Sequence, residues 1–471
     1  MKELKSLAKN TGLLVIGQFG TKLLSFFLVP LYTYVLTTAE YGTFDLMNTG
    51  ISLLVPIFTL NICDSALRFP LDPKNDRTEV FSICIYHFLV CVIIGVILIA
   101  INYIFGFISI VNDYPILFLM MFASMAINGI LNCFARGIDC VKDVAISGVV
   151  CSLVMICLNL FFLLILHMGL LGFFMAYILG IVSQSFYLFL SIKGWKFVKW
   201  KHLDSKLHQE MLDFSKPMIL TNISWWVNGL SNRYIITWLS GIAANGIYSV
   251  SYKIPSILMM FQSIFGQAWT LSAVHEFDRD DKNGFFSKLY SSYNVSMTLV
   301  CSVLIILSRT IAELLYNKDF YNAWKYAPFL TIAAVFGALS GYIGGIYAAT
   351  KDTKAFARTS IVGAVVNLVL TFLLVWQMGV LGASIASLVS YGLVWIMRIR
   401  TVKRYMNLHI SLFRDCLGYS ILLVQTGLLF VLDDNLLFFG LEIVLLTTII
   451  AINKSLLKTI MNKMYKKIVV K

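Results

Sequence analysis

Long apolar runs dominate the chain, and each is long enough to cross a bilayer as an α-helix. A hydrocarbon core about 30 Å thick needs roughly 20 apolar residues in a helix. The runs are far longer than the ~10-residue alternating strands of a membrane barrel. We therefore predict an all-α, polytopic transmembrane bundle of about fourteen spans. The predicted spans are residues 11–36, 42–66, 80–106, 114–135, 144–166, 169–192, 217–240, 243–272, 285–308, 326–349, 359–376, 379–397, 416–432 and 436–453.

Polar side chains recur at helical spacing in four of these spans, the first, second, seventh and eighth. Positions separated by three, four, seven and eleven residues share one face of a helix. Lipid offers no partner for such groups, so the polar stripes should face a water-accessible interior. An equal alternative for the serines is that they only hold neighbouring helices together. The stripes are Gln18, Lys22 and Ser25; Asp45, Thr49, Ser52, Pro56 and Thr59; Asn222, Trp226, Gly229 and Arg233; and Ser249, Lys253, Ser256, Ser263 and Gln267.

Three basic residues fall inside the predicted spans: Lys22, Arg233 and Lys253. A Lys or Arg at the centre of a spanning helix costs about 2.5–3.5 kcal/mol on insertion scales. Such residues usually face a bundle interior and mark a transport pathway. We therefore treat these three cations as candidates for binding an anionic substrate.

The positive charge of the chain follows its predicted topology. The 471 residues are 59% hydrophobic and 13% charged, with a mean hydropathy of +0.82 and a net charge of +13. Of the 37 Lys and Arg, outer loops hold three (Arg309, Lys318 and Lys325), spans hold three, and inner segments hold the remaining 31. This asymmetry predicts that both termini are cytoplasmic. The positive net charge is thus explained by the membrane topology, and no nucleic-acid partner is expected.

A short sequence motif recurs at a spacing of 210 residues. Residues 168–172 (MGLLG) return as residues 378–382 (MGVLG), and Asn159 upstream of the first has a counterpart in Asn367. Transporters are often built from such repeats. We predict two pseudo-symmetric six-helix lobes and two extra helices. The predicted parts are an N-terminal lobe at 1–192, a basic cytoplasmic linker at 193–216, a C-terminal lobe at 217–415, and two further spans with a basic tail at 416–471.

No motif indicates catalysis or a cofactor. The sequence has no phosphate-binding loop, dinucleotide fingerprint or HExxH motif. None of the nine cysteines forms a CxxC pair, and no histidine is spaced with another candidate metal ligand. We expect neither an enzyme nor a metal site.

The opening of the chain and its architecture resemble a known transporter family. Residues 23–26 (LLSF), 30–32 (PLY), Leu36 and 40–42 (EYG), together with two six-span lobes and two extra helices, resemble the polysaccharide flippases of the MOP superfamily. The nearest likeness is to O-antigen and capsule exporters of the Wzx type. The resemblance implies alternating-access transport of an undecaprenyl-pyrophosphate-linked oligosaccharide across the bacterial inner membrane, from the cytoplasmic to the outer leaflet. It also implies partners among the glycan-assembly proteins, such as a polysaccharide polymerase.

The candidate residues suit this substrate. A pyrophosphate needs cationic partners such as Lys22, Arg233 and Lys253 once it leaves water. Amides and an aromatic face suit sugars, and Gln18, Asn222 and Trp226 offer both, although Trp226 has core packing as its alternative. Asp45 and Asp64 are candidates for coupling to a proton or sodium gradient. The alternative for Asp64 is an ion pair with Arg68, one turn away.

Two other functions stay open. One is a multidrug or cation antiporter of the same superfamily, which typically has twelve spans and cation-binding carboxylates. The other is a membrane-embedded polysaccharide polymerase or ligase, which usually carries a large outer loop. The longest outer loop here, 309–325, is too short for such a domain.

The predicted topology can be tested with reporter fusions at residues 205 and 471. Because both positions are expected in the cytoplasm, a reporter that is active only in the cytoplasm should be active at both. Activity of an export-dependent reporter at these positions would contradict the topology.

Overall fold

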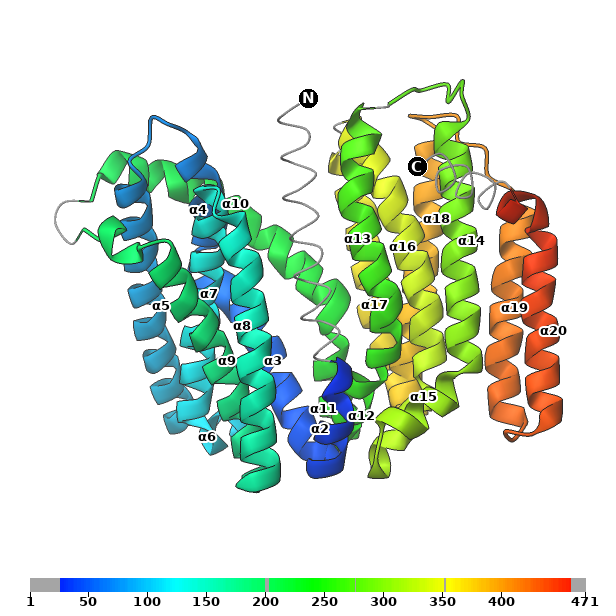
Figure 1. Ribbon diagram of the computed structural model, residues 1–471, viewed down its shortest axis with the longest axis horizontal. Coiled ribbons are helices and arrows are strands. Elements are labelled where there is room, and N and C mark those ends of the chain that lie inside the picture. Colours follow the sequence, from blue (N-terminus) through cyan, green and yellow to red (C-terminus); the bar gives the residue numbers. More distant parts are fainter. Residues whose placement is uncertain (1–25, 200–202, 276, 351–352, 459–471) are drawn as a thin grey trace. The chain divides into compact units, whose positions relative to one another are not determined.

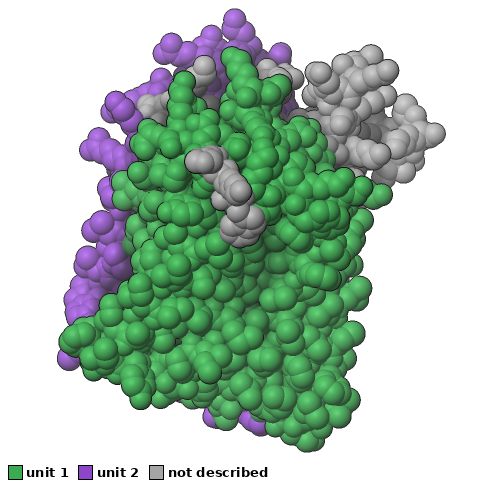
Figure 2. Space-filling view, turned by 90° about the vertical axis from the view of Figure 1, so that its left-hand side faces the viewer, with its two compact units in different colours: residues 1–230 green, residues 231–471 purple. Residues whose placement is uncertain are grey.

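The computed structural model describes residues 26–199, 203–275, 277–350 and 353–458 (Figure 1). Every regular element in these ranges is a helix, which confirms the predicted all-α class. The chain forms two compact units, residues 1–230 and residues 231–471, which are coloured separately in Figure 2. Each unit is described by itself.

The helices have the length and composition of a multi-pass membrane protein. Among the described residues, nine helices are long and apolar enough to span a bilayer, and one bent helix pair makes ten. The number fourteen stays a prediction. The nine are Arg77–Phe105, Pro115–Gly137, Val141–Ile165, Gly169–Ser191, Phe285–Ile306, Ala327–Tyr347, Lys354–Met378, Val380–Val402 and Leu412–Val431.

Unit 1 packs around one apolar cluster. Buried side chains of α4, α5, α7, α9 and α10 meet there, among them Phe81, Phe134 and Met211. Side chains on the opposite face of α5, such as Ile93 and Ile97, are exposed as a lipid-facing surface requires. The helices of this unit are α2 Val29–Val35, α3 Thr38–Phe58, α4 Ile62–Arg68, η1 Phe69–Leu71, α5 Arg77–Phe105, α6 Ser109–Asp113, α7 Pro115–Gly137, α8 Val141–Asn159, η2 Leu160–Ile165, α9 Gly169–Ser191, η3 Gly194–Phe197 and α10 Ser205–Leu230.

Unit 2 is organised around α16, which packs against α13, α14 and α18. Most of α16 is buried, whereas α17 keeps a broad exposed apolar face. The helices of this unit are α11 Asn232–Ser240, α12 Ile242–Ser251, α13 Lys253–His275, α14 Phe285–Ile306, α15 Ser308–Leu315, η4 Lys318–Lys325, α16 Ala327–Ala349, α17 Thr353–Met378, α18 Val380–Val402, α19 Leu412–Val431 and α20 Leu436–Ile452.

The repeated motif forms the same kind of turn in both units. Gly169, the first residue of α9, has φ +54°, and Gly379, directly before α18, has φ +58°. This backbone conformation favours glycine. Four residues after the methionine of each motif, Gly172 and Gly382 pack so closely on the previous helix that an added Cβ would overlap it. The spacing of the motif therefore reflects one tight helical hairpin used twice.

The seventh and eighth predicted spans are each broken in the structure. The predicted span 217–240 is interrupted at Ser231, where α10 ends and α11 begins, because α10 packs on α3, α4 and α5 of unit 1 while α11 packs on α17 and α18 of unit 2. The predicted span 243–272 is interrupted at Tyr252. Pro255 has no N–H to donate to the carbonyl of Ser251, so a continuous helix would lose a hydrogen bond at this point.

The unit boundary also differs from the predicted linker at 193–216. Helix α10 begins at Ser205, inside that stretch, and continues to Leu230. Hydrogen bonds join α10 to other helices of unit 1. For example, the hydroxyl of Ser65 on α4 donates to the carbonyl of Met211 at 2.7 Å. The division into repeat halves stays a prediction.

Two histidines from distant parts of unit 1 meet at the start of α10. The Nε2 atoms of His87 on α5 and His208 on α10 lie 2.8 Å apart, within hydrogen-bond distance. One ring must donate and the other accept, so at most one of them is protonated on both nitrogens. Burial, aided by the nearby charge of Lys216, lowers the pKa of His208 below its ordinary value of 6.5.

The His87–His208 contact should weaken in acid. Because the pKa of His208 is lower in the folded protein than in the unfolded chain, the contact gives its full stability above pH 6.5 and loses it as the pH falls below that value. Amide exchange of residues 205–216, corrected for intrinsic rates, should rise by up to about tenfold per pH unit below this point. His208→Gln should abolish this pH dependence. His409→Gln, at an exposed histidine of unit 2, should leave it unchanged; the same pH dependence in His208→Gln would contradict the assignment.

Candidate functional site

The predicted site residues divide between the two units and the part of the chain that is not described. Gln18 and Lys22 lie outside the described residues. Asp45, Asp64, Asn222 and Trp226 belong to unit 1. Arg233 and Lys253 belong to unit 2.

In unit 1 the second predicted span is a broken helix. Helices α3 and α4 meet at an angle of 65°. Leu60 and Asn61, between them, have φ values of +51° and +52°, which are unusual for residues other than glycine. Pro56, near the end of α3, cannot donate an N–H to the preceding turn. Breaks of this kind occur where transporters bind substrates or ions.

Asn222 and Asp64 meet at this break through Asn61. The Nδ2 of Asn222 on α10 donates to Oδ1 of Asn61 at 3.0 Å, and the Nδ2 of Asn61 donates to Asp64 at 2.5 Å. Asn61 is buried, so these bonds offset much of the cost of burying its amide. Within the described residues Asp64 forms no ion pair with Arg68, so the alternative considered for Asp64 is wrong.

Trp226 on α10 is hydrogen-bonded to α3, the helix before the break. Its indole N–H donates to the carbonyl of Thr49 at 2.8 Å. Asp45 lies one turn before Thr49 and is half-buried. The predicted polar stripes of α3 and α10 therefore meet at Thr49 and Trp226.

In unit 2, Arg233 lies in the first turn of α11 with 9% of its surface exposed. Its guanidinium carbon is 5.3 Å from the centroid of the Tyr252 ring, within the range of a cation–π interaction. Lys253, the next residue after Tyr252, is half-buried at the start of α13. Tyr252 therefore contacts the side chain of Arg233 and directly precedes Lys253 in the sequence.

A buried polar network extends from Tyr252 into the core of unit 2. The hydroxyls of Tyr252 and Tyr248 are 3.1 Å apart, and Asn232 donates from Nδ2 to Tyr248 at 3.1 Å and to Ser387 at 3.0 Å. The Oδ1 of Asn232 accepts from Asn367 at 2.8 Å and from Thr371 at 3.1 Å. Asn232 is only 3% exposed. This Asn232 network therefore links α11 and α12 to α17 and α18 and satisfies the Asn232 amide.

The Asn232 network fixes the position of its neighbour in the chain, Arg233. The network consists of neutral amides and hydroxyls, and an apolar cluster that includes Ile236, Leu330 and Val375 packs beside it. Buried polar networks whose members are all paired make an element rigid and specify its position. The arrangement can therefore hold a guanidinium in a fixed orientation toward an anionic ligand.

Most of the Asn232 network lies outside the predicted site. Asn367 is predicted only as a repeat counterpart, and Asn232, next to Arg233, is not among the predicted site residues. A signal was nevertheless present. Asn367 and Thr371 are four residues apart, and Ser387 and Ser390 three apart, so each pair lies on one helical face.

Arg398 lies in a different environment from the predicted one. The predicted span ends at residue 397, which leaves Arg398 in an inner segment, but α18 continues to Val402 and buries Arg398 to 5% exposure. Its guanidinium donates to the carbonyl of Ser340 on α16 at 2.8 Å, and to the hydroxyls of Thr359 at 3.2 Å and Ser360 at 2.8 Å on α17. It also lies over the Phe356 ring at 4.3 Å. Arg398 therefore joins three helices, and hydropathy alone cannot distinguish such an arginine from a loop residue.

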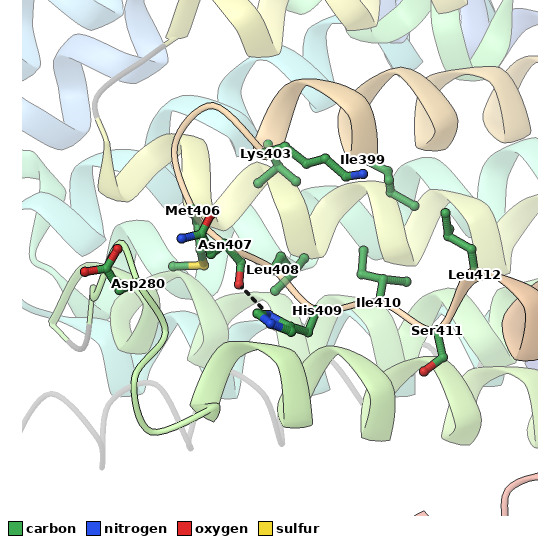
Figure 3. Close-up of a pocket in the computed structure, with 11 residues that line it drawn as sticks. Asp280, Ile399, Lys403, Met406, Asn407, Leu408, His409, Ile410, Ser411 and Leu412 are labelled. Carbon is green, nitrogen blue, oxygen red and sulfur yellow. Dashed lines mark hydrogen bonds between the residues drawn. The ribbon is translucent and has the colours of Figure 1, made fainter.

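A pocket of about 630 Å³ lies at the end of α18 in unit 2 (Figure 3). Its wall combines apolar and polar side chains, with Lys403 and Asp280 as charges of opposite sign. Nδ1 of His409 is within 3.0 Å of the Asn407 carbonyl, the contact drawn in Figure 3. None of the candidate site residues lines this pocket.

Similarity to known proteins adds to this geometry. The polysaccharide biosynthesis protein family matches residues 7–274. A Haloferax volcanii protein described as probable low-salt glycan biosynthesis flippase Agl15 is 18% identical over 203 residues, which cover 42% of this chain and 43% of that protein, less than half its length.

The fold is similar to those of solved membrane transporters. The lipid II flippase MurJ in an inward closed conformation superposes with a TM-score of 0.69 at 15% identity, over 97% of this chain and 99% of its own. An inward-facing multidrug resistance MATE transporter of the MOP superfamily superposes with a TM-score of 0.65 at 14% identity, over 82% and 95%. The chain belongs to the polysaccharide biosynthesis protein family and has the fold of MOP-superfamily transporters.

Proposed function

We propose that this protein is a flippase for an oligosaccharide linked to undecaprenyl pyrophosphate, which it moves from the cytoplasmic to the outer leaflet during surface polysaccharide assembly, as for O-antigen or capsule. The observation that carries this proposal is membership of a polysaccharide biosynthesis family in a chain whose fold is that of transporters. Two similar proteins, Agl15 and MurJ, are named as flippases. A transporter is therefore favoured over an enzyme.

A multidrug or cation antiporter of the same superfamily is the alternative. The extent of the structural similarity favours the flippase, because MurJ superposes on 97% of this chain and the MATE transporter on 82%. The cationic rather than acidic character of Arg233 and Lys253 also favours an anionic cargo.

Arg233 and Lys253 are proposed to bind the pyrophosphate, together with Lys22. Arginine offers a planar pair of donors for phosphate oxygens, whereas lysine offers a point charge. The Asn232 network supports this role because it holds the first turn of α11, and with it Arg233, against α17 and α18. A preorganised cation loses less entropy when it binds its ligand.

Asn222, Trp226 and Gln18 are proposed to contact the sugars. The indole N–H of Trp226 is already bonded to Thr49, so Trp226 would offer a ring face for stacking rather than a donor. Asp45 and Asp64 stay the candidates for coupling to a proton or sodium gradient. The proposed location is the bacterial inner membrane with both termini cytoplasmic, beside a polysaccharide polymerase and other glycan-assembly proteins.

Removing either cation of unit 2 should abolish transport. We expect Arg233→Ala or Lys253→Ala to reduce surface glycan at least about tenfold at unchanged protein level, because each loses a charged contact worth more than about 1.4 kcal/mol. Arg233→Lys should restore only part of it, since lysine lacks the paired donors. The measurement is surface glycan per cell, normalised to membrane-inserted protein.

Lys282→Ala serves as a matched control, because Lys282 is an exposed cation of the same unit. It should leave glycan display unchanged. Normal display in Lys22→Ala, Arg233→Ala and Lys253→Ala alike would exclude a cationic binding site.

Outward transport should depend on the membrane potential. Moving one charge across the membrane changes its free energy by about 2.3 kcal/mol per 100 mV of potential. A head group with about two negative charges is therefore stabilised by on the order of 4–5 kcal/mol per 100 mV when it leaves a negative interior. Collapse of the potential by an ionophore, at constant ATP, should slow the appearance of lipid-linked oligosaccharide in the outer leaflet. Transport that follows ATP and ignores the potential and ion gradients would contradict the mechanism.

A further inference from the structure

The last two helices of unit 2 enclose a carboxyl group in an apolar environment. Helix α20 is apolar over most of its length, and its Glu442 has 0% of its surface exposed. Gln425 on the neighbouring helix α19 is equally buried and lies beside the Glu442 carboxyl. The two helices lie side by side in Figure 1, and both pack against α14. This buried pair plays no part in the proposed substrate site.

The polar atoms of this pair lack hydrogen-bond partners. Among the described residues, neither carboxyl oxygen of Glu442 and neither amide atom of Gln425 forms a hydrogen bond of normal geometry. Buried polar groups are normally paired, so this pair of side chains requires an explanation in terms of a bound proton, ion or water.

Within the part of the chain that the structure describes, Glu442 forms no ion pair. Of the helices packed on α20, α14 carries Lys288, and α19 carries Arg414, which is paired with Asp415 at 2.8 Å. Near the turn before α20, Arg309 is paired with Asp434 at 2.6 Å. The other titratable groups of α14 and α19 are Tyr290, Tyr293, Cys301, Cys416 and Tyr419, all neutral in their ordinary forms. An ionised Glu442 would thus be an unpaired buried charge, which is strongly unfavourable.

We propose that Glu442 is a proton-binding site within the membrane. The protonated carboxyl donates its O–H to Oε1 of Gln425, and its carbonyl oxygen accepts an N–H from Nε2 of Gln425. A small rotation of the two side chains satisfies both, because a carboxylic acid and a primary amide each offer one donor beside one acceptor. A sodium ion would use only oxygens and leave the Gln425 N–H groups unpaired. The proposal does not depend on the transported substrate.

The protonation state can be measured directly by infrared difference spectroscopy on the purified full-length protein in lipid. At neutral pH, wild type minus Glu442→Gln should show the C=O band of a protonated carboxyl. Asp433→Asn, which removes an exposed carboxylate in the turn between α19 and α20, should retain that band. Gln425→Leu should keep the band and shift it toward the frequency of a carboxyl without a hydrogen bond.

Each other outcome overturns part or all of the proposal. A wild-type spectrum that differs from Glu442→Gln only in the bands of an ionised carboxylate excludes the bound proton. A protonated band that appears only when sodium is removed assigns the site to sodium instead. An unshifted band in Gln425→Leu excludes the pairing with Gln425.

Discussion

Polar groups inside a bilayer must find partners within the protein, because the hydrocarbon supplies none. This constraint explains where the helices of the structure break. The break between α3 and α4 is bridged by Asn61, and the breaks at Ser231 and Tyr252 flank the Asn232 network. Each interruption of the backbone thus has paired side chains next to it. Three of the candidate site residues, Asp64, Arg233 and Lys253, lie within a few residues of these same breaks.

The apolar pattern was sufficient to predict the fold class and most helices. Helices α5, α7, α9, α14 and α18 each lie within a few residues of the predicted span. The repeated MG–G motif corresponds to a local structural requirement, since glycine suits both the positive φ at Gly169 and Gly379 and the close packing at Gly172 and Gly382. These features depend on local chemistry, and local chemistry can be deduced from the sequence.

The long-range pairings could not be deduced in this way. Nothing in the sequence pairs Asn222 with Asn61, His87 with His208, or Asn232 with Asn367, because these partners are more than 100 residues apart. The expected pairing of Asp64 with Arg68 rested on helical spacing alone, yet an amide three residues away binds the carboxylate instead. Arg398 shows the reverse error, because its charge suggested a loop while its hydrogen bonds place it in the core. Two of the candidate residues, Gln18 and Lys22, stay predictions.

The two contacts that fasten α10 to unit 1 have a consequence for sequence change. Trp226 bonds to Thr49 on α3, and Asn222 bonds to Asn61 at the break between α3 and α4. One turn of α10 is therefore hydrogen-bonded both to α3 and to the residue at which α3 and α4 are bent. Insertion or deletion of one residue between Asn222 and Trp226 would rotate one side chain by about 100° relative to the other. Only one of the two contacts could then be kept. Homologous sequences should therefore tolerate length changes in the loops around α10 far better than in this turn, even though the turn contains no glycine, no proline and no charged residue.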